Sequence, residues 1–137
     1  MTTTNRELPA VHSLTAGDSM QGPVHFLSKT DSFDDALAFF IDKNVTAAPV
    51  LGANGRVVGV LSVTDLLVHM RENRSAENLL VTVESLMTPT LFTVTRSTSL
   101  TDVIRDIVRT NVHHIFVADD EIILGVISVR DILKHIN

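Results

Sequence analysis

Residues 59–67 of the chain read GVLSVTDLL, and residues 125–133 read GVISVRDIL. The glycine, the serine, the valine that follows the serine and the aspartate are identical, and most other positions keep their apolar or polar character. The one change in kind is that Thr64 of the first string becomes a permanent cation, Arg130, in the second. A string that returns in this way within a chain of 137 residues predicts a structure with internal pseudo-symmetry.

The repeat extends well beyond this string. Ser32 and Asp35 recur as Ser99 and Asp102, and the apolar residues after each pair recur with them at helical spacing. The second copy is one residue shorter, and the loss falls where the turn GANG is replaced by DDE, as expected of a surface turn. Two copies are too few for a solenoid. We therefore expect two units that pack against each other.

These repeats divide the chain into three segments. We expect a flexible N-terminal tail at residues 1–14, a first unit with its linker at residues 15–78, and a second unit at residues 79–137. Hydrophobic residues make up 45% of the chain, which is enough for a real core. By size the two units together form one domain.

The sequence pattern of each unit predicts the element order β-α-β-β-α. This order gives an α+β fold in which both helices cover one face of a small sheet. Apolar residues at i, i+3, i+4 and i+7 predict the first helix, and the Ser-x-x-Asp pattern at its start predicts a capping box. Short β-branched stretches on either side of the turn predict a hairpin. The predicted strands are 24–27, 48–51 and 57–61 in the first unit and 91–94, 115–118 and 122–127 in the second, and the closing helices begin near Thr64 and Arg130.

The composition argues against several classes of function. A net charge of −5 disfavours binding along a nucleic-acid backbone. No apolar run approaches the roughly 18 residues that a membrane span needs, and the polar N-terminus precedes no signal-peptide core. With no cysteine in the chain, we expect a cytoplasmic protein without membrane contact. The six histidines include no His-x-x-x-His spacing, so we expect no metal site.

The repeated string also suggests a chemistry. A glycine inside a strand marks a place where other groups come close, and a serine where a strand meets a helix faces unpaired N–H groups that suit phosphate. A carboxylate three residues later accepts two hydrogen bonds side by side, as the vicinal hydroxyls of ribose would donate them. This combination is typical of a nucleoside site. The competing interpretation is that Ser62-x-x-Asp65 and Ser128-x-x-Asp131 are only helix caps.

The same combination resembles the signature of the CBS domain, a family named after cystathionine β-synthase: a glycine, two apolar residues, Thr or Ser, two variable residues and Asp. The resemblance covers nearly the whole chain after residue 15. It implies a tandem pair, called a Bateman module, whose two units pack about a pseudo-twofold axis. It also implies two clefts that can hold adenosine derivatives such as AMP, ADP, ATP or S-adenosylmethionine, with no cofactor required.

The resemblance assigns roles to particular residues. The Asp holds the ribose, the Ser faces ribose or phosphate, and residues of the opening strands line the clefts. The assigned residues are Ser62, Thr64 and Asp65 in one cleft, Ser128, Arg130, Asp131 and His114 in the other, and Val24, His25, Leu91 and Phe92 in the strands. Arg130 and His114 have no cationic counterpart in the first copy, so we expect the cleft with Asp131 to bind phosphate better.

Three hypotheses for the function follow. The first is a regulatory module, not an enzyme, that binds an adenine nucleotide and acts on a separate protein target. As the family's pairs commonly do, it would form a homodimer through its helix faces. The second is an interaction scaffold with empty clefts, in which both Ser-x-x-Asp motifs are only caps. The third, a small enzyme, is the weakest, because the sequence shows no pairing of a nucleophile with a base.

Overall fold

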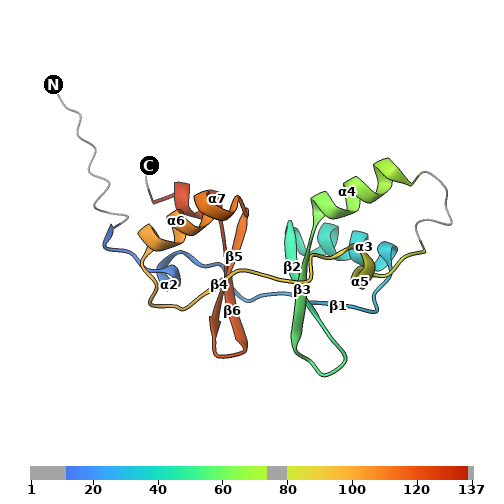
Figure 1. Ribbon diagram of the computed structural model, residues 1–137, viewed down its shortest axis with the longest axis horizontal. Coiled ribbons are helices and arrows are strands. Elements are labelled where there is room, and N and C mark those ends of the chain that lie inside the picture. The colour runs from blue at the N-terminus through green and yellow to red at the C-terminus, as the bar shows by residue number, and fades with distance from the viewer. Residues whose placement is uncertain (1–11, 74–79, 136–137) are drawn as a thin grey trace. The chain divides into compact units, whose positions relative to one another are not determined.

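The computed structural model describes residues 12–73 and 80–135 of the chain (Figure 1). The chain forms two compact units. We call them the central unit, His25–Leu91, and the terminal unit, which combines Met1–Val24 with Phe92–Asn137. In each unit a three-stranded sheet packs against helices, so the predicted α+β class is confirmed.

The central unit has the strand order β1-β2-β3. Strand β1 pairs with β2 in parallel, and β2 and β3 form the predicted antiparallel hairpin. Its elements in chain order are β1 (Leu27–Ser28), α3 (Phe33–Lys43), β2 (Ala47–Leu51), β3 (Val57–Ser62), α4 (Val63–Glu72) and α5 (Val83–Leu86).

The terminal unit repeats this topology with the strand order β4-β5-β6. Strand β4 is parallel to β5, and β5 and β6 form the antiparallel hairpin. Its elements in chain order are α2 (Ala16–Ser19), β4 (Thr93–Val94), α6 (Leu100–Thr110), β5 (His114–Asp119), β6 (Ile122–Ser128) and α7 (Val129–Leu133).

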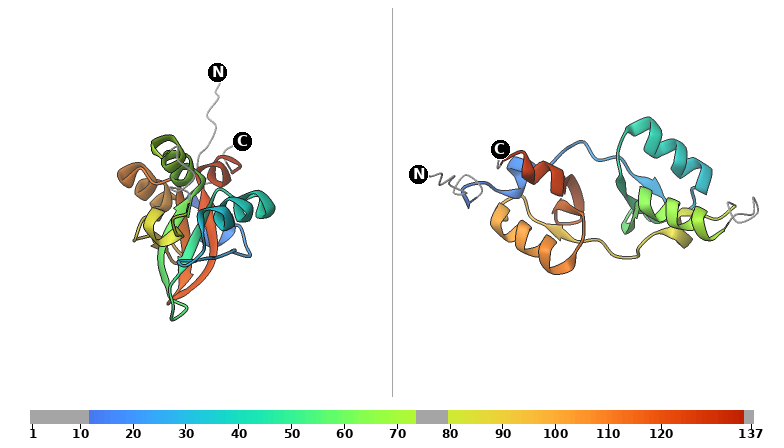
Figure 2. Two further views of the ribbon diagram at one scale, coloured as in Figure 1. Left: turned by 90° about the vertical axis from the view of Figure 1, so that its right-hand side faces the viewer. Right: turned by 90° about the horizontal axis from the view of Figure 1, so that it is seen from above.

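Each unit has its own hydrophobic core between its sheet and its helices. In the central unit α3 and α4 lie on the same side of the sheet (Figures 1 and 2), and Phe33 and Leu66 from these helices pack with Leu61 of β3. In the terminal unit Leu100 of α6 and Ile132 of α7 pack with Ile127 of β6. The predicted placement of both helices on one face therefore holds within each unit.

The two opening strands are shorter than predicted. We expected strands over residues 24–27 and 91–94, and only the last part of each stretch pairs with the hairpin behind it. The reason is register, since only Leu27 of the first stretch and only Thr93 and Val94 of the second come opposite a hairpin strand, and the first strand continues to Ser28. The pairs are Leu27 with Val50, Ser28 with Leu51, Thr93 with Phe116, and Val94 with Val117.

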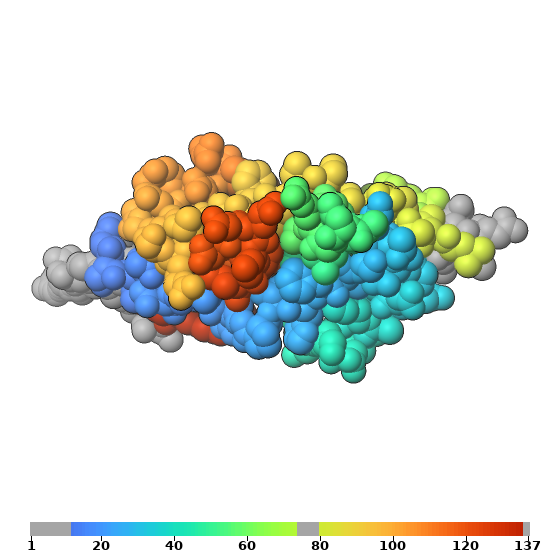
Figure 3. Space-filling model, turned by 90° about the horizontal axis from the view of Figure 1, so that it is seen from below, coloured from blue at the N-terminus to red at the C-terminus, as the bar shows by residue number. Residues whose placement is uncertain are grey.

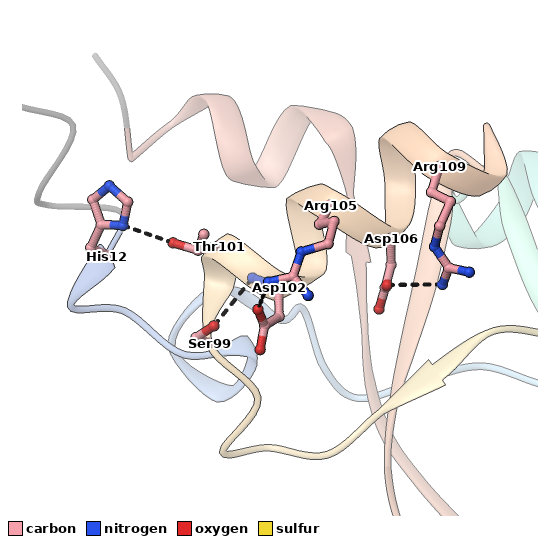
Figure 4. A network of polar contacts seen from close by, with 7 residues as sticks. All are labelled: His12, Ser99, Thr101, Asp102, Arg105, Asp106 and Arg109. Carbon is pink, nitrogen blue, oxygen red and sulfur yellow. Dashed lines mark hydrogen bonds and ion pairs between the residues drawn. The ribbon is translucent and has the colours of Figure 1, made fainter.

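The cap predicted at the start of α3 forms in full, and the one at the start of α6 forms only in part. In α3, Asp35 N donates to Ser32 Oγ at 3.0 Å and Ser32 N donates to the Asp35 carboxylate at 3.1 Å. In α6, Asp102 N donates to Ser99 Oγ, but the Asp102 carboxylate pairs with Arg105 instead (Figure 4). A cation one turn further along the helix supplies the carboxylate with a charged partner in place of the backbone N–H.

The units are built across the boundaries of the sequence repeats. The boundaries expected from the repeats, 15–78 and 79–137, mark where each copy begins and ends in sequence, whereas the spatial division falls after Val24 and after Leu91. The segment that precedes each opening strand contributes a fully buried residue to the core formed by the other copy, Ala16 in the terminal unit and Val83 in the central unit. Burial of these apolar side chains favours the exchange.

Hydrogen bonds hold both exchanged segments in the same way. In the terminal unit Gln21 and Val126 exchange two backbone hydrogen bonds of 2.8 and 3.0 Å. In the central unit Thr88 and Val60 exchange two backbone hydrogen bonds of 2.9 Å each. Gln21 and Thr88 therefore occupy equivalent positions in the two units.

Residues 1–11 of the predicted tail and residues 74–79, most of the predicted linker, lie outside the described residues. The rest of the predicted tail contacts the terminal unit, where the Leu14 carbonyl accepts a hydrogen bond of 2.9 Å from Leu100 N. His12 Nδ1 lies 3.0 Å from Thr101 Oγ1 (Figure 4). The hairpin turns, where the two copies differ in length, are exposed and reach the surface seen in Figure 3 as green and orange-red atoms.

Candidate functional site

In the central unit the repeated string spans β3 and the start of α4, and Ser62 is the N-cap of the helix. Asp65 N donates to Ser62 Oγ at 3.2 Å, and Ser62 N donates to Asp65 Oδ2 at 2.8 Å. The structure therefore confirms that this Ser-x-x-Asp is a capping box. The cap uses one oxygen of the Asp65 carboxylate. Among the residues that the structure describes, none donates a hydrogen bond to the other oxygen, Oδ1.

In the terminal unit Ser128 caps α7 by the same reciprocal bonds. Asp131 N donates to Ser128 Oγ at 3.3 Å, and Ser128 N donates to Asp131 Oδ2 at 2.9 Å. Ser128 Oγ also lies 3.0 Å from the same Oδ2 and can donate to it. Asp131 is buried, with 7% of its surface exposed, whereas Asp65 is half-buried. Both lone pairs of Asp131 Oδ2 are thus engaged within the cap.

The second oxygen of Asp131 also has partners, in contrast to that of Asp65. Gln21 Nε2 donates a hydrogen bond of 3.1 Å to Asp131 Oδ1. The Lys134 ammonium lies 3.7 Å from the same oxygen. A buried carboxylate needs such donors to offset the loss of its hydration. Gln21 and Lys134 were missed by the sequence reasoning, although Met20-Gln21 aligns with Met87-Thr88 in the repeat and could have drawn attention to this position.

His114 lies beside the cap of the terminal unit. It is the register partner of Ser128 across β5 and β6, just as Ala47 is the partner of Ser62 across β2 and β3. Burial lowers the pKa of His114 from its ordinary value of 6.5, and nearby His113 lowers it further, while Asp131 raises it in part. His114 is therefore neutral at pH 7, and it can serve a ligand as a hydrogen-bond donor or acceptor but not as a permanent cation.

The remaining predicted site residues divide between the two units. Arg130 and Thr64 are both exposed in the first turn of their helices, α7 and α4. The terminal unit holds Ser128, Arg130, Asp131, His114, Val24 and Phe92, and the central unit holds Ser62, Thr64, Asp65, His25 and Leu91. Within the terminal unit, Phe92 is tied to the hairpin because its carbonyl accepts a hydrogen bond of 2.9 Å from Phe116 N.

The glycine of the repeated string makes room for the chain's own backbone. A Cβ added at Gly125 would lie 2.8 Å from Met20 Sδ and 2.9 Å from the Gln21 carbonyl oxygen. A Cβ added at Gly59 would fall on the Thr88 carbonyl oxygen and lie 3.2 Å from Pro89 Cα. The sequence predicts a close approach at this glycine, and the group that approaches is the exchanged segment. The Ser and Asp remain as the groups that could hold a ligand.

The described parts of the chain contain no cluster of metal-binding side chains and no membrane-spanning helix. Over residues 12–73 and 80–135, no three His, Asp or Glu side chains gather closely enough to hold a metal ion. No helix within those ranges is long and apolar enough to cross a membrane.

Comparison with protein families assigns the chain. The model of the CBS domain matches residues 16–72 and again residues 83–137. The chain belongs to the CBS domain family. The two matches make it a tandem CBS pair, as the repeated string predicted. CBS pairs typically regulate rather than catalyse.

Similar proteins include both long and short members of the family. The chain is 35% identical over 106 residues to the γ-3 subunit of the 5'-AMP-activated protein kinase from Sus scrofa, which matches 72% of this chain but only 20% of the subunit. It is 28% identical over 159 residues to the chloroplastic CBS domain-containing protein CBSX2 from Arabidopsis thaliana, covering 95% of this chain and 67% of that protein. The chain thus spans about a fifth of the kinase subunit's length.

Solved structures agree with the fold of the CBS pair. A crystal structure of CBSX2 in complex with AMP has a TM-score of 0.75 and 31% sequence identity, over 89% of this chain and 95% of that one. The CBS domain of a bacterial CNNM/CorC family Mg²⁺ transporter, in a complex with ATP, has a TM-score of 0.80 over 94% of this chain and 91% of that one. At 20% identity the second likeness shows the fold alone.

Proposed function

We propose that this CBS pair is a regulatory module that binds adenine nucleotides and acts on a separate protein. The observation that carries the proposal is the Ser-x-x-Asp cap, present in both units, whose carboxylate keeps one oxygen, Oδ1, outside the cap. A ribose hydroxyl is a donor of the kind that this oxygen accepts. The similarity to CBSX2, whose crystal structure is a complex with AMP, supports the same class of ligand.

The two strand-to-helix junctions supply the elements of a nucleotide site. Backbone N–H groups at the start of a helix favour phosphate, and the caps hold Asp65 and Asp131 in fixed orientations beside them. Val24 and Phe92 in the terminal unit, and His25 and Leu91 in the central unit, are the proposed apolar and ring contacts for the base. AMP, ADP, ATP and S-adenosylmethionine are the candidate ligands.

We propose that the phosphates lie on the terminal unit. Arg130 is exposed in the first turn of α7, where its permanent charge can reach an anion. Neutral His114 adds a hydrogen-bonding group beside Ser128 rather than a second charge. The central unit has Thr64 and Ala47 at these positions and so favours a ligand with less negative charge.

The mode of action is a shift between arrangements of the protein. A bound nucleotide stabilises whichever arrangement it binds more tightly, and the shift cannot exceed that difference in affinity. CBS pairs are typically regulatory rather than catalytic, so we propose that the module is not itself an enzyme. The predicted cytoplasmic location remains a prediction, and cell fractionation with an antibody to the chain tests it.

A homodimer is part of the proposal. The helices of the central unit expose large apolar side chains, of which Ile41 is 74% exposed and Leu67 is 58% exposed. Leu37 and Met70 on the same two helices are also exposed. Several exposed large apolar side chains on two helices support an interface there. Sedimentation equilibrium tests the proposal, with a dimer expected for the natural chain and a monomer for the Ile41→Glu, Leu67→Glu double variant.

The nucleotide proposal is tested by thermal unfolding. We would measure the melting temperature with AMP, ATP, NADH and S-adenosylmethionine, and repeat the series with Asp131→Ala and Asp65→Ala. A ligand at 100 times its Kd stabilises the folded state by about 2.7 kcal/mol. No shift with any of the four ligands would contradict the proposal and favour the scaffold hypothesis. Equal loss in both variants would contradict the preference of phosphate for the terminal unit, and steady turnover of a nucleotide would identify an enzyme.

A further inference from the structure

The carboxamide of Gln21 takes one of the two acceptor positions on the Asp131 oxygen that ribose hydroxyls would need. Asp131 Oδ2 already receives Ser128 N at 2.9 Å and has Ser128 Oγ at 3.0 Å. A carboxylate oxygen has two lone pairs, so Oδ2 has no remaining place for a ligand. Oδ1 is the only other oxygen of this carboxylate, and Gln21 Nε2 donates to it at 3.1 Å while Lys134 stands 3.7 Å away.

The central unit shows the same position without this contact. Thr88 is bonded to Val60 by the same pair of backbone hydrogen bonds that join Gln21 to Val126. The Thr88 side chain ends one bond beyond Cβ and has no amide to extend, and within the described residues no donor reaches Asp65 Oδ1. The contact therefore depends on the identity of one side chain, because the backbone geometry and the capping box are common to both units.

We propose that Gln21 is a tethered competitor for the ribose site on Asp131, and that it lowers the affinity of the terminal unit for nucleosides relative to the central unit. The inference rests on the proposed function. Gln21 takes one of the two lone pairs of Oδ1, so a ligand that places both ribose hydroxyls on Asp131 must displace the carboxamide. No described residue donates to the corresponding oxygen of Asp65. Gln21 thus favours ligands that make additional contacts, such as phosphates bound to Arg130, because these contacts offset the free energy of the lost hydrogen bond.

The test exchanges the two side chains. In an Asp65→Asn background, which leaves only the terminal unit with its carboxylate, we would compare Gln21 with Gln21→Thr by titration calorimetry. ATP and 2′,3′-dideoxy-ATP are the ligands. The net value of such a hydrogen bond predicts that ATP binds about tenfold more tightly to Gln21→Thr. Dideoxy-ATP, which has no ribose hydroxyl to use the released oxygen, should bind both proteins equally. Thr88 already occupies the equivalent position, so the substitution suits the backbone.

The reciprocal variant tests the same inference in the other unit. In an Asp131→Asn background, Thr88→Gln should weaken ATP binding by about the same factor, because the new carboxamide can reach Asp65 Oδ1. Melting temperatures of all four proteins verify that they are folded.

Three results would overturn the inference. The first is that Gln21→Thr leaves the affinity for ATP unchanged or weakens it. The second is that dideoxy-ATP gains as much affinity as ATP, which would mean that steric relief rather than the freed oxygen is responsible. The third is that Thr88→Gln has no effect on ATP binding. The proposed function is judged separately on the natural chain. If the natural chain binds ATP while Gln21→Thr brings no gain, the inference fails and the function stands. If neither the natural chain nor Gln21→Thr binds any nucleotide, both fail. Binding that appears only with Gln21→Thr supports both.

Discussion

The central and terminal units carry the same capping box at the same junction, and they differ in what surrounds its aspartate. Asp65 is half-buried and has one oxygen without a protein donor in the described structure, whereas Asp131 is buried and contacts Gln21 and Lys134. Across the hairpin the central unit presents Ala47 and the terminal unit presents His114. A duplicated motif therefore preserves a structural role in both copies, while single side chains outside it decide how many donors reach each aspartate.

The largest effect should come from the glycines that admit the exchanged segments. Gly59→Ala would force a Cβ onto the Thr88 carbonyl and against Pro89, both backbone atoms that cannot move aside. We expect a loss of about 3 kcal/mol in the free energy of unfolding. A Cβ at either site also meets a methionine side chain, but at Gly125 the nearest backbone atom, the Gln21 carbonyl oxygen, lies farther away, at 2.9 Å, so the loss for Gly125→Ala should be smaller. Denaturant unfolding measures both, and equal losses would contradict the difference.

A control for this comparison is available in the hairpin turn. Gly55 has φ of +79°, and a Cβ added there meets nothing within 4 Å. Gly55→Asn should change the stability little, since Asn tolerates the left-handed region.

The next effect concerns the two caps. Ser62→Ala and Ser128→Ala should each cost about 1 kcal/mol of stability, and the loss should be larger for Ser128 because its hydroxyl also contacts the buried Asp131 carboxylate. Thermal unfolding measures both variants. Ser128→Thr, which keeps the hydroxyl, serves as the control and should stay close to the natural chain. A larger loss at Ser62 would reverse the comparison.

His114 should make the terminal unit sensitive to pH. Its pKa is lowered in the folded state by burial and by His113, whereas the unfolded chain has the ordinary value of 6.5. Between these two values the unfolded chain binds more protons, so the stability due to neutral His114 is complete above pH 6.5 and is lost as the pH falls through the folded pKa. Denaturant unfolding at a series of pH values should show a shallower dependence for His114→Ala, which copies Ala47. An unchanged dependence would contradict the assignment.

The smallest effect is expected from the ion pair in the last turn of α7. Lys134 Nζ stands 3.7 Å from Asp131, and the lysine side chain is 61% exposed. Solvent screens such a pair, so Lys134→Ala should cost less than about 1 kcal/mol. The cost should fall further at high salt. Unfolding at low and high salt measures it, with Lys134→Arg as the control. A loss that does not depend on salt would mean that the side chain acts by packing.

Much of the fold was predictable from local patterns. The helices α3 and α6 follow from apolar residues at helical spacing, and the hairpins follow from β-branched stretches around a turn, because both signals lie within a few residues of sequence. A complete capping box was predicted at Ser99, and only half of it forms. Sequence spacing alone does not reveal that Arg105 forms an ion pair with the Asp102 carboxylate. The opening strands were drawn too long, since register depends on the partner strand.

The candidate site was predictable in part. Both Ser-x-x-Asp motifs and the position of His114 beside Ser128 follow from aligning the two copies. The contact of Gln21 with Asp131 joins residues 110 positions apart. No local sequence pattern predicts this contact, because the contact forms only when the segment before the first strand packs against the unit of the second copy.

By itself, the sequence determined the duplication, the α+β class, the family and the identity of the capping residues. These properties depend on short-range periodicity and on a repeated string that can be compared with itself. Only the tertiary structure decided which copy each connecting segment packs against, why the glycine of the string must be a glycine, and which aspartate is already occupied. Those outcomes depend on the burial of Ala16 and Val83 in distant cores and on backbone bonds across the repeat boundary, neither of which is visible in sequence order.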